Sequence, residues 1–242
     1  MIPTDVLNLP THMSTSYASA HPFPHIVIDN FLNQFMLEQI LSELTVYNNW
    51  TTDNSDYVRK HQVEKYFTPQ GLDPNDLTRF EQHAPKTKLV IDYLNSKEVL
   101  NFLENITGIK QLIADTSLFG GGVHKIGAGG KLDVHADFNI QFKSGLHRRI
   151  NMLIYLNKDW QDSWGGELEL WEKDLSKCFL KVKPIFNRAV IFNITDDAYH
   201  GHPHPLTTPP GVARYSLAMY YYTQDRPDHE KNPWHPVMWK SI

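Results

Sequence analysis

The sequence predicts an α+β fold, in which helices of the first half (about residues 1–110) support an antiparallel double-sheet jelly roll (about residues 115–225). Two observations predict it. Apolar residues recur at helical spacing in the first half. The second half carries short runs rich in β-branched and aromatic residues, separated by turn signals, as is typical of a β-sandwich or barrel. We expect both parts to share one core and to form a single domain over residues 1–242.

The first half contains one expected strand among less regular segments. The first twenty residues are expected to form a loose lead-in. The apolar run "FPHIVIDNFL" (residues 23–32) predicts a short strand. Residues 54–76 are polar and irregular, and helical patterns return after them through "KLVIDYLNS" (residues 88–96).

Two helices of the first half have recognisable starting residues. Asn33 is an expected N-cap, and the apolar residues on one face of the helix after it are Met36, Ile40, Leu41 and Leu44. Ser96 is a second expected N-cap, followed by an inward face made of Val99, Leu100, Leu103 and Ile106. Gly108 is the expected end of that helix, because glycine adopts the left-handed conformation that closes helices.

The second half predicts a series of antiparallel strands. Its first stretch, residues 120–142, mixes glycine turns with alternating residues. The strand-like runs that follow are "RRINMLIYLN" (residues 148–157), "GELELW" (residues 166–171), "RAVIFNI" (residues 188–194) and "ARYSLAMYYYT" (residues 213–223).

Composition and charge narrow the class of protein. Hydrophobic residues make up 41% of the chain, which is enough for a packed core. The formal net charge of -4 argues against a nucleic-acid-binding surface. The single cysteine, Cys178, excludes an internal disulfide framework and fits a reducing compartment. Because we find no secretion signal and no apolar stretch long enough to span a membrane, we expect a soluble cytoplasmic protein.

The segment "VHADF" offers the first candidate metal ligands. Residues i and i+2 of a strand project to the same side, so His135 and Asp137 point into the same space. One imidazole and one carboxylate are two of the three ligands of the facial triad that holds non-heme Fe(II). The alternative is that both are ordinary surface or structural residues, so a third ligand must come from elsewhere in the chain.

The third ligand is expected in "YHGHPHPL" (residues 199–206), which prolines prevent from forming a helix. It contains His200, His202 and His204, which share one face if the strand is regular. The spacing alone leaves all three open as ligands. The competing interpretation is a polar loop with no metal.

The last strand offers an anion-binding residue. Arg214 begins a strongly apolar run, and a buried guanidinium needs an anionic partner such as a carboxylate. Ser216 lies two residues on and faces the same side. A dicarboxylate that chelates a metal through one end could pair with Arg214 through the other. The alternative is an edge-strand arginine that reaches solvent.

These motifs together resemble a known family. "HAD", "YLNKDW", "GGELELW", His200 and "RYS" follow one another in the order found in Fe(II)- and 2-oxoglutarate-dependent dioxygenases. The chain resembles their prolyl-hydroxylase branch most, including the oxygen-sensing prolyl hydroxylases. The resemblance covers about the second half, from "GGGVHKI" to "YYYT". It implies a double-stranded β-helix of the cupin-like type, which agrees with the jelly roll.

The resemblance also implies roles for individual residues. His135, Asp137 and His200 would hold Fe(II), with His202 as the fallback for the third ligand and His204 near the site entrance. The residues implied in 2-oxoglutarate binding are Arg214, Tyr155, Ser216 and Leu168. Arg148, beside Arg149, is a candidate substrate contact, with plain surface charge as the alternative. The chain departs from its relatives at Ala218 and Ile126, where they carry threonine and tyrosine. His124 could fill part of that pocket, but the favoured interpretation is a histidine that is hydrogen-bonded inside the glycine-rich turn.

The implied reaction is hydroxylation of an unactivated C–H bond with release of succinate and CO2. Fe(II), 2-oxoglutarate and O2 are the implied cofactors, with ascorbate as a further one. The candidate substrates are a prolyl residue in a protein or peptide, free proline, or another small metabolite. Two other classes stay open at this point: a non-catalytic jelly-roll binding module and a zinc hydrolase. A nucleic-acid demethylase is disfavoured, because Tyr220, Tyr221 and Tyr222 stand where such enzymes carry a second arginine.

Overall fold

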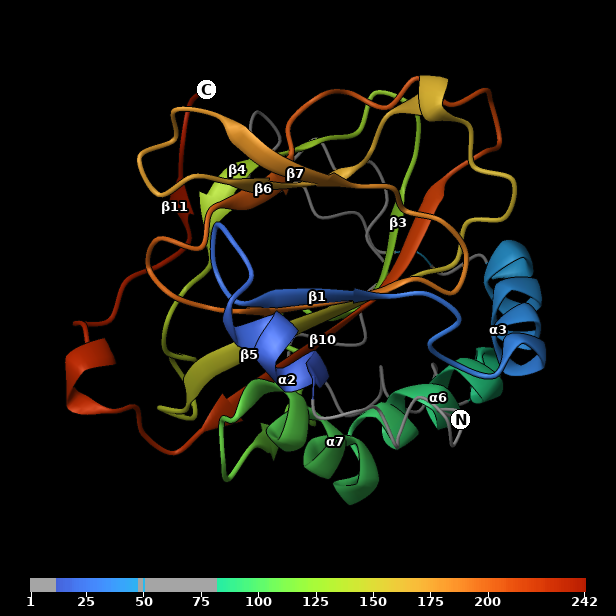
Figure 1. Ribbon diagram of the computed structural model, residues 1–242. Helices are drawn as coiled ribbons and strands as arrows, with labels where there is room; N and C mark the ends of the chain where they lie inside the picture. The colour runs from blue at the N-terminus through green and yellow to red at the C-terminus, as the bar shows by residue number, and fades with distance from the viewer. Residues whose placement is uncertain (1–11, 48–49, 51–81) are drawn as a thin grey trace.

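Two antiparallel sheets lie in two facing layers in the computed structural model, which describes residues 12–47, 50 and 82–242 (Figure 1). The six-stranded sheet has the order β1-β8-β5-β10-β2, with β3 also paired to β10. The five-stranded sheet has the order β11-β4-β9-β6-β7. Two antiparallel sheets with non-sequential neighbours, flanked by helices, confirm the predicted α+β jelly roll.

The strands of the six-stranded sheet are β1 (His25–Ile28), β2 (Ile113–Ala114), β3 (Gly122–Ile126), β5 (His147–Tyr155), β8 (Ala189–Asn193) and β10 (Arg214–Thr223). Those of the five-stranded sheet are β4 (Leu132–Ala136), β6 (Leu168–Trp171), β7 (Cys178–Val182), β9 (His200–His202) and β11 (Met238–Trp239). The helices are α2 (His12–Ala18), α3 (Gln34–Val46), α6 (Pro85–Leu94) and α7 (Lys97–Thr107), with 3-10 turns η1 (Asp162–Trp164) and η2 (Asp228–Glu230).

The helix starts agree with the sequence predictions. The Asn33 side chain accepts a hydrogen bond from the Met36 backbone N–H at 3.2 Å, and α3 begins at the next residue. Ser96 caps α7, which ends at Gly108 with φ 75°. Two details differ: α3 buries Leu37 in addition to Ile40 and Leu44, and α7 buries Phe102 rather than Leu100.

One expectation about the first half is wrong. Residues 12–18, part of the expected loose lead-in, form the helix α2. Its Tyr17 side chain is buried, and its hydroxyl donates a 2.6 Å hydrogen bond to the Asn193 side chain on β8. That contact attaches α2 to the sheet across a long sequence separation, which no local pattern reveals. The irregular segment expected at residues 54–76 lies outside the described residues.

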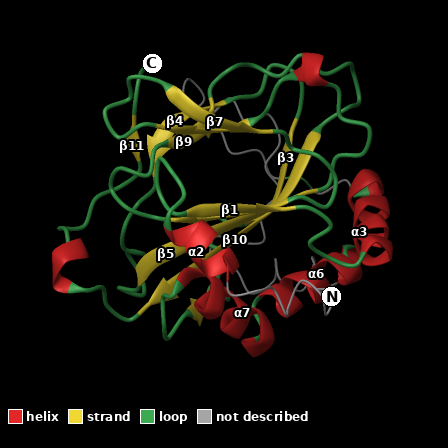
Figure 2. Ribbon diagram, in the orientation of Figure 1, coloured by secondary structure: helices red, strands yellow, loops and turns green. Residues whose placement is uncertain are grey.

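The helices pack on the outer face of the six-stranded sheet, as Figure 2 shows for α2, α6 and α7. Strand alternation then divides β5 between two environments. The residues that face the helices are Ile150, Met152 and Ile154. The residues that face the opposite sheet are Asn151, Leu153 and Tyr155. The functional side chains of β5 are therefore directed into the space between the two sheets.

Within the described ranges, no helix is long and apolar enough to cross a bilayer.

Candidate functional site

The three predicted metal ligands lie together between the sheets. β9 pairs with β4 so that His200 stands opposite His135, and Asp137 follows β4 directly. His135 Nε2 is 3.6 Å from Asp137 Oδ1, and His200 Nε2 is 3.4 Å from Asp137 Oδ2. One ligand atom from each of the three residues lies within 4.8 Å of the others, and all three residues are buried.

Backbone carbonyls orient both imidazoles in the same way. His135 Nδ1 donates to the Asp133 carbonyl at 2.8 Å, and His200 Nδ1 donates to the Ala198 carbonyl at 2.9 Å. A carbonyl oxygen only accepts hydrogen bonds, so the proton of each neutral ring is on Nδ1. Each Nε2 therefore presents a lone pair toward Asp137, which is the arrangement that metal-binding histidines adopt.

The Asp137 carboxylate is held from its other side by two residues of β5. Asn151 Nδ2 donates to Asp137 Oδ2 at 2.8 Å, and Arg148 Nη2 lies 3.1 Å from the same oxygen. Burial by itself raises the pKa of Asp137, but the Arg148 charge and the contacts with His135 and His200 lower it, and the pKa lies well below its usual value. Asp137 is thus held as a carboxylate.

Arg148 is enclosed rather than exposed. Its guanidinium lies 3.5 Å from the centroid of the Tyr220 ring and 4.6 Å from that of Phe138, and it donates twice to Asn151 Oδ1. The side chain is 1% exposed, so its interpretation as plain surface charge is wrong. The neighbouring Arg149 is also buried, with Glu230 Oε2 at 2.9 Å. A substrate contact for Arg148 stays a prediction, while its contacts in the fold are with Asp137 and Asn151.

The cluster fits a divalent metal ion. Two imidazole nitrogens with free lone pairs and one ionised carboxylate form the two-histidine, one-carboxylate donor set of non-heme Fe(II) sites. Burial, followed by the proximity of His200, lowers the pKa of His135, so that ring is in the neutral form a metal requires. The two Nε2 atoms lie 3.4 and 3.6 Å from the Asp137 carboxylate oxygens, so an ion between them would be within reach of all three groups.

A small cavity of about 60 Å³ extends from this cluster between the sheets. Its walls include His135, Asp137, His200, Leu168, Arg214 and Ser216. All six were expected at the site from the sequence. Tyr155 stands opposite Ser216 in the pairing of β5 with β10, and its hydroxyl lies 3.3 Å from Arg214 Nη2. The structure thus brings the expected metal ligands and the expected anion-binding residues to one cavity.

Arg214 has the environment of an anion-binding residue. It is 3% exposed, and its Nε donates to the Gly166 carbonyl at 2.8 Å. Burial lowers its pKa, while Tyr155 and the Glu167 carboxylate act in the opposite direction. Among the described residues, Glu167 forms no direct ion pair with the guanidinium, so a buried cation is left without a contacting anion. That arrangement is costly, so the cavity is suited to a ligand that brings a carboxylate to this end.

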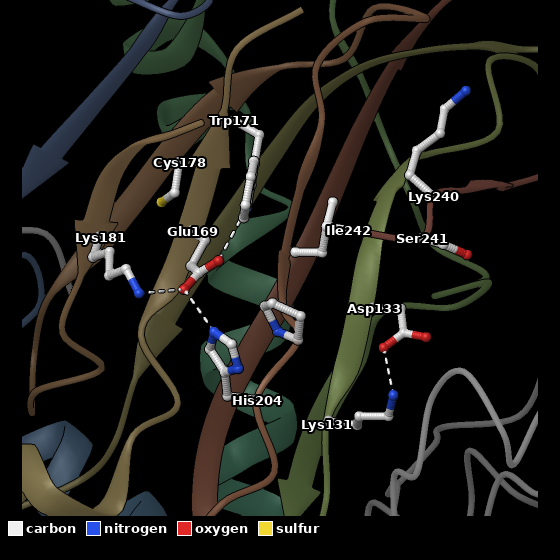
Figure 3. A pocket seen from close by; sticks show the side chains of 11 residues that line it. Lys131, Asp133, Glu169, Trp171, Cys178, Lys181, His204, Lys240, Ser241 and Ile242 are labelled. Carbon is white, nitrogen blue, oxygen red and sulfur yellow. Dashed lines mark hydrogen bonds and ion pairs between the residues drawn. The ribbon is translucent and has the colours of Figure 1, made fainter. Parts of the chain in front are cut away.

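The three clustered histidines do not share one face. His202 lines the cavity beyond His200. Pro203 ends β9, and the His204 side chain is 73% exposed, 3.8 Å from Glu169 Oε1. Figure 3 shows His204 and Lys181 directed at Glu169, in a different pocket of about 490 Å³. The expectation that His204 lies near the site entrance is therefore wrong, because alternation stops with the strand. His124 lines the cavity, with Nε2 3.1 Å from the Gly120 carbonyl.

Three further residues contribute to the site and were not predicted from the sequence. Asn151 was detectable, because it shares a strand face with Tyr155 and interrupts an apolar run. Tyr220, over Arg148, lies in the run of three tyrosines on β10. Trp239, whose ring centroid is 4.9 Å from that of His135, lies on the two-residue strand β11 and has no sequence signal.

Comparisons with solved structures agree with this fold. The chain is similar to a prolyl-4-hydroxylase from Pseudomonas putida (15% identity, TM-score 0.57, covering 89% of this chain and 99% of the other). It is similar to HygX from Streptomyces hygroscopicus with nickel, 2-oxoglutarate and hygromycin B bound (13% identity, TM-score 0.59, 95% and 97%). A third similar structure is a prolyl hydroxylase from Trichoplax adhaerens in complex with a hypoxia inducible factor peptide fragment (17% identity, TM-score 0.50, 88% and 90%). Identities this low indicate a shared fold, the double-stranded β-helix.

The sequence itself matches a family model over the part that builds the site. Residues 121–222 match the model described as the 2OG-Fe(II) oxygenase superfamily. This range contains the His135, Asp137 and His200 cluster and the Arg214 anion site. The resemblance to Fe(II)- and 2-oxoglutarate-dependent oxygenases that the sequence motifs predicted is therefore confirmed over residues 121–222.

Proposed function

We propose that this protein is an Fe(II)- and 2-oxoglutarate-dependent dioxygenase that hydroxylates an unactivated C–H bond. The observation that carries the proposal is the buried cluster of His135, Asp137 and His200, with both Nε2 lone pairs turned toward the carboxylate. A non-catalytic binding module would have no need for three buried metal-binding groups. A zinc hydrolase would need a positioned general base and a site for one water, whereas this cavity leads to a cationic anchor.

Each residue of the site has a defined part in this proposal. His135, Asp137 and His200 hold the metal, and Asn151 and Arg148 hold Asp137 in place. Arg214 pairs with the far carboxylate of 2-oxoglutarate, with Tyr155 and Ser216 beside it and Leu168 on the cavity wall. With O2, the loaded metal and 2-oxoglutarate supply the oxidising power for hydroxylation, with succinate and CO2 as the other products. Trp239 shields the His135 ring.

The substrate proposed is a prolyl residue in a protein or peptide, with free proline as the smaller alternative. Similarity of fold to two prolyl hydroxylases supports this choice, one of them solved with a peptide. HygX also has a similar fold, and it was solved with the small molecule hygromycin B bound. A small metabolite is therefore the competing substrate class. Ascorbate stays a prediction from the family resemblance.

The first test needs no substrate. Fe(II) and then 2-oxoglutarate are added to the protein without oxygen, and the visible charge-transfer band of the chelate is recorded. We expect the band in the wild type, its loss in Asp137→Ala and His200→Ala, and a much higher 2-oxoglutarate requirement in Arg214→Met. His204→Ala is the matched control, because that exposed side chain belongs to another pocket. A folded wild-type protein without the band would contradict the proposal and favour a binding module.

The substrate class is then tested separately. Proline-containing peptides, free proline and a panel of small metabolites are incubated with the loaded protein in air, and each is examined for the mass gain of one oxygen atom. A gain confined to peptidyl proline supports the proposed class. A gain on a small metabolite alone would contradict it while leaving the dioxygenase proposal intact.

A further inference from the structure

His202 is a buried polar side chain with no partner. It is 4% exposed, and neither ring nitrogen has a hydrogen-bond partner within the described residues. His135 and His200, by contrast, each donate through Nδ1 to a backbone carbonyl. Buried polar groups are almost always hydrogen-bonded, so this ring requires a partner, which a ligand, an ion or a water in the cavity would supply.

The strand register places His202 beyond the metal cluster, not within it. β9 lies between β4 and β6; His200 stands opposite His135, and His202 stands opposite Leu132. Two residues of extended strand span about 7 Å. His202 is therefore one row of side chains further along the cavity than the metal ligands. It is not one of the three residues that bring ligand atoms within 4.8 Å of one another.

The same end of the cavity holds the anion-binding residues. Arg214 and Ser216 line the cavity from β10, and His124 lines it from β3. The groups that act electrostatically on His202 are Arg214, His135 and His124, and none of them is a carboxylate. An imidazole ring carries at least one N–H donor, and both His202 and Arg214 line this cavity. An N–H donor with no partner and a guanidinium with no ion pair among the described residues thus face the same space.

We propose that His202 is a second anchor for the far carboxylate of 2-oxoglutarate and a determinant of co-substrate specificity. The inference rests on the proposed function and deepens it. Arg214 supplies charge, and His202 supplies a donor at a fixed distance from the metal, set by the pairing of β9 with β4. A 2-oxo acid that lacks the second carboxylate would gain nothing from His202, so this residue favours 2-oxoglutarate over monocarboxylic 2-oxo acids.

The test measures binding rather than turnover. The full-length protein is loaded with Mn(II), and the dissociation constants of Mn(II), 2-oxoglutarate and pyruvate are measured by calorimetry for the wild type and His202→Leu. We expect His202→Leu to bind 2-oxoglutarate at least about tenfold more weakly, as expected for a lost hydrogen bond to a charged group. Mn(II) and pyruvate affinities should change less than about twofold. His204→Leu, two residues on and exposed, should leave all three affinities unchanged.

A second readout separates this role from a structural one. Because His202→Leu removes an unpartnered buried polar group, the metal-free variant should melt at a temperature equal to or above that of the wild type. His202→Asn keeps an N–H donor and should recover part of the 2-oxoglutarate affinity that His202→Leu loses. If the leucine variant does not fold, the asparagine variant is used in its place in the binding test.

Three outcomes would overturn the inference. If His202→Leu leaves 2-oxoglutarate affinity unchanged, His202 is not an anchor. If the variant loses Mn(II) affinity, His202 is a metal ligand instead. Equal losses of affinity for 2-oxoglutarate and pyruvate would indicate a general disturbance of the cavity. Failure of the proposed function looks different. In that case the wild-type protein itself would bind no 2-oxoglutarate when loaded with metal.

Discussion

Replacing Arg148 by methionine removes the guanidinium that pairs with Asp137 while keeping a side chain of similar length. The two groups are 3.1 Å apart, and both are buried. The variant leaves a buried carboxylate that has lost its counter-ion, a change that costs about 3–5 kcal/mol of unfolding free energy. For a chain of this length, each kcal/mol lowers the melting temperature by about 2–4 °C, so we expect a fall of roughly 6–20 °C.

Arg149→Met is the matched control. Arg149 lies on the same strand, but its partner Glu230 is 31% exposed and can return to water when the pair is broken. The expected loss is about 1 kcal/mol, as for an ion pair near the surface. Urea unfolding of both variants at neutral pH measures the two losses.

A double variant tests the cause of the loss. If the unpaired Asp137 charge is responsible, then Asp137→Asn should cost less in the Arg148→Met background than in the wild type. We expect a coupling free energy of about 2 kcal/mol or more. Equal losses in Arg148→Met and Arg149→Met, or additive losses in the double variant, would refute the assignment of Arg148 as the residue that holds Asp137.

Three further predictions follow from single positions. A Cβ on Gly201 would meet the Leu132 and Asp133 carbonyl oxygens at 2.8 and 2.9 Å, so Gly201→Ala should push β9 away from β4. We expect this variant to lose about 1–3 kcal/mol of unfolding free energy and to bind Mn(II) more weakly. Gly127→Ala, which has open space around its Cβ, should change neither stability nor Mn(II) binding. The buried Asn187 side chain accepts a hydrogen bond from the Leu32 N–H at 2.8 Å and donates one to the Leu32 carbonyl at 2.7 Å. Asn187→Ala should therefore lower the free energy of unfolding, measured in urea, by about 2–4 kcal/mol. Burial raises the pKa of Tyr220 from 10.0 to about 12, so between these pH values the folded chain keeps a proton that the unfolded chain releases. Tyr220 alone should therefore lower the free energy of unfolding by about 1.4 kcal/mol per pH unit as pH rises through that window, in addition to the other buried tyrosines. In urea unfolding, Tyr220→Phe should show a pH slope smaller than that of the wild type by this amount.

The parts of the fold that depend on local chemistry could be predicted from the sequence. The Asn33 and Ser96 side chains each accept a hydrogen bond from a backbone N–H three residues further on. A capping residue in front of an apolar helical pattern is therefore sufficient to predict where the helix begins. Alternation likewise gave the shared direction of His135 and Asp137. In each case the geometry depends on neighbours along the chain.

The parts of the fold that depend on pairing between distant strands could not be predicted from the sequence. The register between β5 and β10 shifts between Tyr221 and Tyr222, so Arg148 and Asn151 reach the same carboxylate although three residues separate them. Simple alternation places them on opposite faces. The sequence also could not decide between His200 and His202 as the third ligand, because both side chains point inward. Only the pairing of β9 with β4 shows that His200, and not His202, stands opposite His135.

The central place of β10 has a consequence for the order in which the molecule is completed. This strand pairs with β2, β3 and β5, all of which precede it in the chain, and it carries Arg214. His200 likewise reaches His135 only when β9 inserts between β4 and β6. During synthesis, the earlier strands can emerge and collapse while the cavity still lacks one metal-binding residue and its cationic end. In the proposed enzyme, metal binding would therefore be coupled to closure of the two sheets, and the bound ion would in turn stabilise the closed form by mass action.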